Sequence, residues 1–130
     1  MFAIEVETTF HASHALRLPE GGEEPMHAHD FRVTVRIEAR ALDSWQTVVD
    51  FHAVERVLAG IVEPWRGRSL NEIPPFDRVV NPSAERIAER IGKLLLAPLE
   101  SMEGEGDRGL RLVEVRITEA AGCLAIWMPD

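Results

Sequence analysis

The sequence predicts an α+β fold in which two helices cover one face of a four-stranded antiparallel sheet. Apolar and polar residues alternate, as in half-buried strands, in two segments near the amino terminus and two near the carboxyl terminus. Between these strand pairs, two segments repeat apolar residues at helical spacing. The resulting order is ββααββ, and packing both helices on one side of the sheet buries the apolar side of every element.

The first predicted strand spans residues 2–14 and the second spans residues 27–41. Their apolar faces carry Phe2, Ile4, Val6 and Phe10 in the first segment and Phe31, Val33, Val35 and Ile37 in the second. A loop rich in glycine and glutamate, residues 21–25, separates the two segments. We therefore expect them to pair as antiparallel neighbours.

The first predicted helix spans residues 52–63, with Asp50 as a capping residue and Pro64 at its exit. Its apolar stripe consists of Val54, Val57, Leu58, Ile61 and Val62. A turn-rich stretch over residues 65–80 follows, and it is long enough to be functional.

The second helix is expected to open at Asn81, with Pro82 in its first turn, and to end or kink at Pro98. Its apolar stripe consists of Ile87, Ile91, Leu94 and Leu95.

The third predicted strand has Val113, Val115 and Ile117 on one face, and Glu119 shares their parity. The last strand spans about residues 122–128.

The opposite face of the sheet is charged, with Glu5, Glu7, Arg32, Arg36, Glu38, Arg40, Glu114 and Arg116. It is either a solvated surface with cross-strand ion pairs or, if the outer strands pair with other subunits, the lining of a polar channel in a closed barrel.

Composition favours a single domain, residues 1–130, that binds a small molecule or a protein. The formal charge of −8, from 14 basic and 22 acidic residues, argues against a nucleic-acid surface. No apolar run is long enough to span a membrane, and the amino terminus does not resemble a signal peptide. Cys123 is the single cysteine, so no intrachain disulfide can form. We therefore expect a cytoplasmic protein without membrane contact.

Three histidines, His14, His27 and His29, fall on the apolar side of the first two predicted strands. An unsatisfied ring nitrogen costs about 1–3 kcal/mol when buried, and one divalent cation can satisfy all three rings. Three nitrogen ligands with an open fourth position are typical of a catalytic zinc site. The alternatives are three separately hydrogen-bonded histidines or a pair that lines a surface groove.

Residues 10–16 (FHASHAL) and 27–31 (HAHDF) resemble the zinc-binding core of the 6-pyruvoyltetrahydropterin synthase family, which includes 6-carboxytetrahydropterin synthase. The resemblance continues through residues 48–51 (VVDF), 70–71 (LN) and 81–85 (NPSAE) and reaches Glu119, so it spans nearly the whole chain.

The resemblance implies a tunnelling fold, in which subunits combine into a barrel and two rings commonly stack into a hexamer, a dimer of trimers, with active sites between subunits. It makes His14, His27 and His29 the zinc ligands and Glu119 the carboxylate that holds the pterin ring. Thr118 and Arg66 are further candidates for substrate binding. Such enzymes belong to tetrahydrobiopterin, queuosine or folate biosynthesis.

Two departures from the family pattern affect catalysis. The family has a catalytic cysteine four residues before the first histidine of the His-x-His pair, where this chain has Glu23. An Asp-His pair precedes the Leu-Asn motif in the family, whereas Arg66 and Gly67 stand here. Some relatives with glutamate at the cysteine position cleave the substrate side chain, so Glu23 is a candidate general base; alternatively, it belongs to a solvated loop. Arg66 could neutralise a bound anion or simply be solvated.

Three functions remain open at this point. The first is a zinc enzyme, a carbon–oxygen lyase or related synthase with altered chemistry, that acts on the side chain of a dihydroneopterin-type substrate. The second is a homologue that binds a pterin or purine-like ligand but has lost synthase activity. The third is a purely structural zinc site, which a fourth protein ligand would support.

Overall fold

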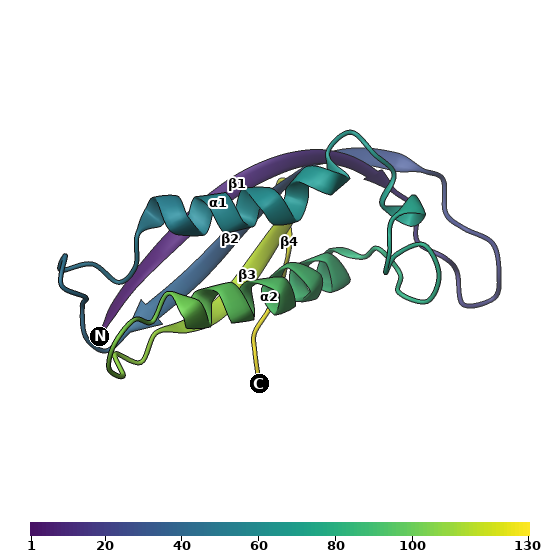
Figure 1. Ribbon diagram of the computed structural model, residues 1–130. Helices are drawn as coiled ribbons and strands as arrows, with labels where there is room; N and C mark the ends of the chain where they lie inside the picture. The colour runs from purple at the N-terminus through teal and green to yellow at the C-terminus, as the bar shows by residue number, and fades with distance from the viewer.

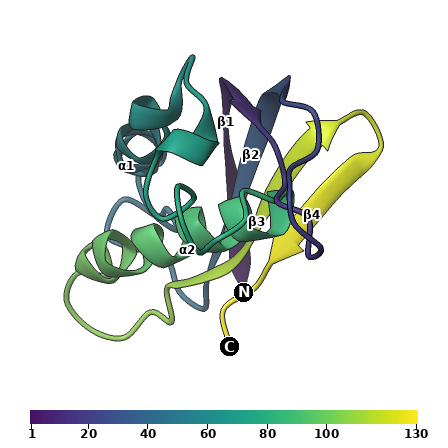
Figure 2. The same cartoon turned by 90° about the vertical axis from the view of Figure 1, so that its right-hand side faces the viewer.

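The computed structural model describes residues 1–130 and has the predicted order of strands and helices (Figure 1). The elements are β1 (Phe2–His14), β2 (His27–Ala39), α1 (Phe51–Val62), α2 (Ala84–Ser101), β3 (Arg111–Ala120) and β4 (Cys123–Trp127), with short 3-10 helices η1 (Glu63–Trp65) and η2 (Leu70–Glu72) between α1 and α2. The strands form one antiparallel sheet in the order β1-β2-β3-β4. Figure 2 shows both helices on the same side of this sheet. The predicted fold class is therefore confirmed.

The hydrophobic core lies between the sheet and the helices. Along β1 and β2 the register pairs Val6 with Val35 and Phe10 with Phe31, as the predicted parity requires. The rings of Phe10 and Phe31 stack with their centroids 5.1 Å apart. The same register continues to the end of the strands, where it pairs His14 with His27. The packing that holds the core together thus also sets the positions of these two histidines.

The opposite face of the sheet carries cross-strand ion pairs. The Arg32 guanidinium lies 3.5 Å from Glu7, and the Arg111 guanidinium lies 3.0 Å from Glu38. The Arg111 side chain holds the pKa of the Glu38 carboxyl below its usual value through this hydrogen bond. Charges of opposite sign on neighbouring strands therefore compensate one another along this face.

Both helices begin at a side-chain cap, but α2 begins later than predicted. The Asp50 carboxylate accepts a hydrogen bond from the backbone N–H of His52 and caps α1 as expected. In α2 the cap is Ser83, whose hydroxyl accepts from the Arg86 N–H. Asn81 and Pro82 precede the helix because both are engaged with the end of β1, as described below. At its other end α2 continues past Pro98 to Ser101, so this proline does not end the helix.

The prediction for the apolar face of β3 was wrong at Val113. The register shifts between Arg36 and Ile37, so that Leu112, not Val113, pairs with Ile37 and is buried. One extra residue in a strand moves the side chains of all residues before it to the opposite face of the sheet. The predicted parity therefore holds only for the residues after this shift, Val115 and Ile117, which are buried.

A short segment after η1 covers part of the free edge of β1. The Gly67 N–H donates to the His11 carbonyl at 2.7 Å, and the Ser13 N–H donates to the Arg68 carbonyl at 3.0 Å. Ser13 and Ser69 form an isolated parallel bridge. Residues 67–69 thus act as a short extra strand next to the end of β1. No helix of the chain has the length and apolar character required to cross a membrane.

Candidate metal centre

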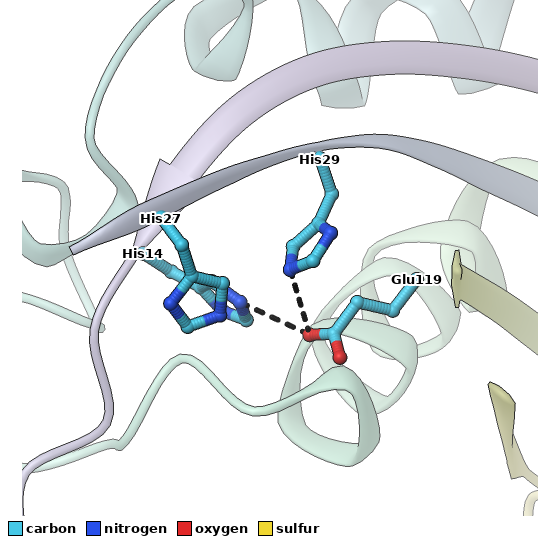
Figure 3. Close-up of side chains that lie close together, drawn as sticks. All are labelled: His14, His27, His29 and Glu119. Carbon is cyan, nitrogen blue, oxygen red and sulfur yellow. Dashed lines mark ion pairs between the residues drawn. The ribbon is translucent and has the colours of Figure 1, made fainter. Parts of the chain in front are cut away.

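Three histidines and one glutamate converge at the end of β1, the start of β2 and the end of β3 (Figure 3). Each of His14, His27, His29 and Glu119 offers one ligand atom, and these four atoms lie within 4.8 Å of one another. The imidazole ring centroids are 4.5–5.3 Å apart. The three histidines that the sequence predicted as ligands are therefore brought together on one face of the sheet.

Backbone carbonyls fix the tautomers of two of these histidines. His14 Nδ1 lies 2.7 Å from the Pro82 carbonyl oxygen, and His27 Nδ1 lies 2.9 Å from the Pro25 carbonyl oxygen. Because a carbonyl can only accept, Nδ1 carries the proton in both rings and donates it. In the neutral ring the lone pair is then on Nε2, which faces the cluster. Such second contacts are typical of histidines that bind metals.

The Glu119 carboxylate meets the histidines at their unpaired nitrogens. Its Oε1 lies 3.0 Å from His14 Nε2 and 3.9 Å from His29 Nε2. Both nitrogens are buried and have no hydrogen-bond partner. A lone pair on the neutral His14 ring that faces a carboxylate oxygen is unfavourable unless a cation lies between them. The donor set of imidazole nitrogens and a carboxylate oxygen therefore suits a divalent transition metal.

Loss of solvation at the partly buried ring lowers the pKa of His29 below its ordinary value, although the charge of Glu119 acts in the opposite direction. The lowered pKa favours the neutral imidazole near neutral pH. Only this form of the ring can donate a lone pair to a metal.

Glu119 reaches the cluster from an irregular point of its strand. The pairing of β3 with β4 shifts between Thr118, which pairs with Leu124, and Ala120, which pairs with Cys123. Glu119 is therefore the extra residue of this irregularity. Bulges commonly redirect a side chain near a functional site, and here the carboxylate points toward the histidines.

Two asparagines fasten the chain that follows His14. The Asn71 side chain accepts from the Ala15 N–H at 2.8 Å and donates to the Ala15 carbonyl at 2.7 Å. Asn81 does the same for Arg17, with distances of 2.7 and 3.0 Å. These contacts explain why Asn81 lies outside α2, and they hold the adjacent Pro82 carbonyl against His14. Both asparagines belong to motifs that carry the family resemblance.

The structure places Glu24 nearer to the cluster than its neighbour Glu23. Glu24 Oε1 lies 3.9 Å from His27 Nε2 and accepts a hydrogen bond from the Leu16 N–H at 3.0 Å. Glu23 is exposed, and its backbone forms an isolated bridge with Arg17. Of the two adjacent glutamates, Glu24 therefore has its carboxylate near a histidine, while Glu23 remains the candidate base predicted from the sequence. The path of the turn decides which of the two glutamates points inward, and the periodicity of the sequence does not reveal it.

The other two predicted site residues, Arg66 and Thr118, form no hydrogen bond or ion pair with the histidines. Arg66 is exposed and donates to Glu63 at 3.0 Å. Thr118 pairs with Arg32, so its side chain shares the charged face of the sheet. Cys123 is exposed in β4.

An open pocket of about 320 Å³ adjoins the cluster, between the start of α2 and β4. Its lining consists of Ala84, Glu85, Glu119, Cys123, Leu124, Ala125 and Ile126. Glu119 belongs to both the pocket and the cluster, so a ligand in the pocket would meet this carboxylate before it met a metal.

Comparisons with solved structures show the same fold in several pterin synthases. The 6-pyruvoyl tetrahydropterin synthase of Caenorhabditis elegans superposes with a TM-score of 0.77 at 15% identity, over 99% of this chain and 96% of that chain. A catalytic-residue mutant of the Plasmodium vivax enzyme gives 0.79 at 16% identity, over 99% and 98%. An uncharacterized protein from Wolinella succinogenes gives 0.69 at 15% identity, with both chains fully covered.

The search of curated proteins by sequence gave no significant match. The family model described as 6-pyruvoyl tetrahydropterin synthase matches residues 3–130, almost the whole chain. The shared fold of the solved pterin synthases agrees with this match. The chain belongs to the 6-pyruvoyl tetrahydropterin synthase family.

Proposed function

We propose that the protein is a zinc-dependent enzyme of pterin metabolism that acts on the side chain of a dihydroneopterin-type substrate. One observation carries the proposal: the buried Nε2 atoms of His14 and His29 lack any hydrogen-bond partner and face the Glu119 carboxylate. Zinc suits three imidazole ligands, with His14, His27 and His29 in this role. When bound, it would lower the pKa of a substrate hydroxyl or of the adjacent carbon acid.

In this proposal the protein supplies substrate orientation and a base. Glu119 holds the ring, because a carboxylate can accept two parallel hydrogen bonds from the amino group and the neighbouring N–H of a pterin. A glutamate of the 21–25 loop removes the proton. The Plasmodium vivax structure is described as a mutant of a catalytic glutamate, so a glutamate serves catalysis in at least one family member. Sequence position favours Glu23 in this chain, and the 3.9 Å approach to His27 favours Glu24.

The first experiment measures zinc content and then incubates the zinc-loaded protein with 7,8-dihydroneopterin triphosphate. Products and bound ligand are followed by mass spectrometry. We expect one zinc per chain and a new pterin product, both lost in His27→Ala. A protein without zinc and without pterin binding would contradict the proposal.

Two matched variants identify the base. If Glu24 is the base, Glu24→Gln should lower turnover by roughly 100-fold or more, the usual range for loss of a general base, while zinc content stays unchanged. Glu23→Gln should then retain activity. The opposite pattern would assign the base to Glu23, and full activity in both variants would remove this loop from catalysis.

A binding protein without turnover is the second candidate function. Arg66 and Gly67 occupy the positions where the family has its Asp-His pair, and the Arg66 guanidinium is engaged with Glu63. These two positions therefore offer no group for proton transfer. Stoichiometric zinc and tight pterin binding without any product would favour this function over the enzyme.

We also propose that the chain assembles into a homo-oligomer, specifically a hexamer built as a dimer of trimers. The sheet ends in two outer strands, β1 and β4, whose far edges pair with no further strand of the sheet. Joining β4 of one subunit to β1 of the next would satisfy both edges and close a barrel.

A further inference from the structure

We propose that Glu119 is a fourth, releasable ligand of the metal, which closes the site until a pterin ring detaches it. This inference rests on the proposed function, because it takes both the metal and the pterin class of ligand from there. It adds a gate to that site. The substrate ring would remove the carboxylate and thereby expose the metal to the side chain of the same substrate.

The geometry puts a carboxylate oxygen where a fourth ligand belongs. Glu119 Oε1 is 3.0 Å from His14 Nε2 and 3.9 Å from His29 Nε2, and the four candidate ligand atoms lie within 4.8 Å. Ligand atoms that each stand about 2.0–2.2 Å from one tetrahedral ion are roughly 3.3–3.6 Å apart, so the two Glu119 distances lie on either side of the expected separation. The carboxylate thus completes the set that the histidines begin (Figure 3).

The four candidate ligands are not held equally. His14 and His27 are fixed by their Nδ1 contacts with the Pro82 and Pro25 carbonyls. The ion pairs of Glu119 are with His14 and His29 alone, so the partners of the carboxylate all belong to the cluster. The Glu119 side chain is 30% exposed, whereas that of His14 is 2% exposed. Glu119 has no hydrogen bond outside the cluster and also lines the adjoining pocket, so it is the candidate ligand that a molecule in the pocket can reach.

A ligand in the adjoining pocket could reach Glu119 and detach it from the metal. Glu119 forms part of the wall of the 320 Å³ pocket between α2 and β4. A ring that donates two parallel hydrogen bonds needs both carboxylate oxygens, including the oxygen that faces His14. The ring and the metal therefore compete for Glu119. A purely structural zinc site would be closed by four buried ligands and would have no such pocket behind one of them.

The test uses the cobalt-substituted full-length protein, whose visible spectrum reports ligand exchange at the metal without any turnover. Azide is the probe for an open coordination position. We expect the wild-type spectrum to be insensitive to azide, because Glu119 fills the fourth position. In Glu119→Ala the position is open, so azide should change the spectrum. The affinity for cobalt should also fall at least about tenfold in this variant, measured by competition with a chelator.

The second step adds 7,8-dihydropterin, a ring without the side chain. It should make the wild-type spectrum sensitive to azide, because the ring withdraws Glu119 from the metal. The ring has no side chain that could replace Glu119 as a ligand. Glu85→Ala, which removes the other carboxylate of the pocket, should behave as wild type before the ring is added. Glu119→Gln retains the size of the side chain and should match Glu119→Ala, which excludes a collapse of the pocket.

Each contrary result has a distinct meaning. A wild-type protein that already responds to azide, with the same spectrum as Glu119→Ala, would overturn the ligand role while leaving the proposed function intact. A wild-type protein that stays insensitive after 7,8-dihydropterin is added would overturn the gate and indicate a closed structural site. Failure of the wild type to bind cobalt or zinc would overturn the proposed function and this inference together.

Discussion

At the scale of single residues, amide side chains hold the histidine cluster in place. Asn71 and Asn81 each make two hydrogen bonds to the backbone of one residue, Ala15 and Arg17 respectively. A side-chain amide that pairs with both the N–H and the carbonyl of a residue imitates a neighbouring strand. The chain beyond His14 is thereby kept next to the Pro82 carbonyl on which the His14 tautomer depends.

Replacing Asn71 should therefore weaken both the fold and the metal site. Asn71→Ala removes two partly buried hydrogen bonds, and we expect the free energy of unfolding to fall by about 1–3 kcal/mol. Asn71→Asp, at a pH where the carboxylate is ionised, keeps the acceptor for the Ala15 N–H but loses the donor. The free energy of unfolding of Asn71→Asp should therefore also fall below that of the wild type, because the Ala15 carbonyl loses its donor. Urea unfolding gives both values, and an unchanged stability in Asn71→Ala would contradict this role.

At the scale of elements, α2 meets the edge of the sheet through a glycine. A Cβ placed on Gly92 would lie 2.1 Å from the Trp127 ring of β4. The partly buried indole packs against the core at this point. The absence of a side chain at Gly92 thus lets β4 approach the helix that forms the other wall of the Glu119 pocket.

Gly92→Ala should displace Trp127 and lower the free energy of unfolding by about 1–3 kcal/mol, the usual cost of overpacking. Gly60→Ala is a matched control in α1, because its Cβ would meet nothing within 4 Å. Alanine has the higher helix propensity, so the control should gain up to about 1 kcal/mol. Thermal unfolding of the two variants should shift in opposite directions. A stable Gly92→Ala protein with unchanged tryptophan fluorescence would refute the contact.

The strands also show where sequence periodicity predicts the structure and where it does not. Regular alternation predicted the pairing of β1 with β2 and the common face of His14, His27 and His29, because both strands are uninterrupted in their pairing with each other. Irregularities in β3 leave no trace in such a pattern. The shift opposite Arg36 and Ile37 brings Leu112 to the core in place of Val113.

The supporting contacts of the site were also beyond sequence reasoning. Backbone carbonyls such as those of Pro25 and Pro82 carry no signature, since every residue has one. The choice between Glu23 and Glu24 depends on the path of a turn. Arg66 was selected by its position relative to the Leu-Asn motif, and in the structure it turns to a nearby acid, Glu63. Residue types and parity thus predicted that the three histidines share a face of the sheet, while the structure was needed for what orients them.

At the scale of the whole molecule, metal binding and folding should be coupled. The three histidines and Glu119 come from three different strands, so an unfolded chain cannot present them together. Zinc at 100 times its dissociation constant should stabilise the protein by about 2.7 kcal/mol and raise its melting temperature by several degrees. A chelator should reverse the shift, and His27→Ala should show none. An equal shift in that variant would place the metal elsewhere.

Assembly should depend on the outer strand β4, which exposes Leu124 and Ile126. A lysine at position 126 would put a charge at the proposed junction with β1 of a neighbouring subunit. We expect Ile126→Lys to dissociate the oligomer, as measured by light scattering. Val79→Lys alters an apolar residue in a loop that is even more exposed than Ile126, and it should leave the oligomer intact. A wild-type protein that is monomeric at micromolar concentration would contradict the proposed assembly.

The segment of residues 67–69 has a further consequence for how the chain avoids misassembly. It already uses the outward N–H of Ser13 and carbonyl of His11 at the end of β1. A strand added from outside can therefore run only along the earlier part of that edge and must stop before the histidines. Growth by strand addition is thus excluded from the end of β1, which disfavours the unlimited stacking that leads to fibrils. Residues 67–69 thus protect the end of the β1 edge.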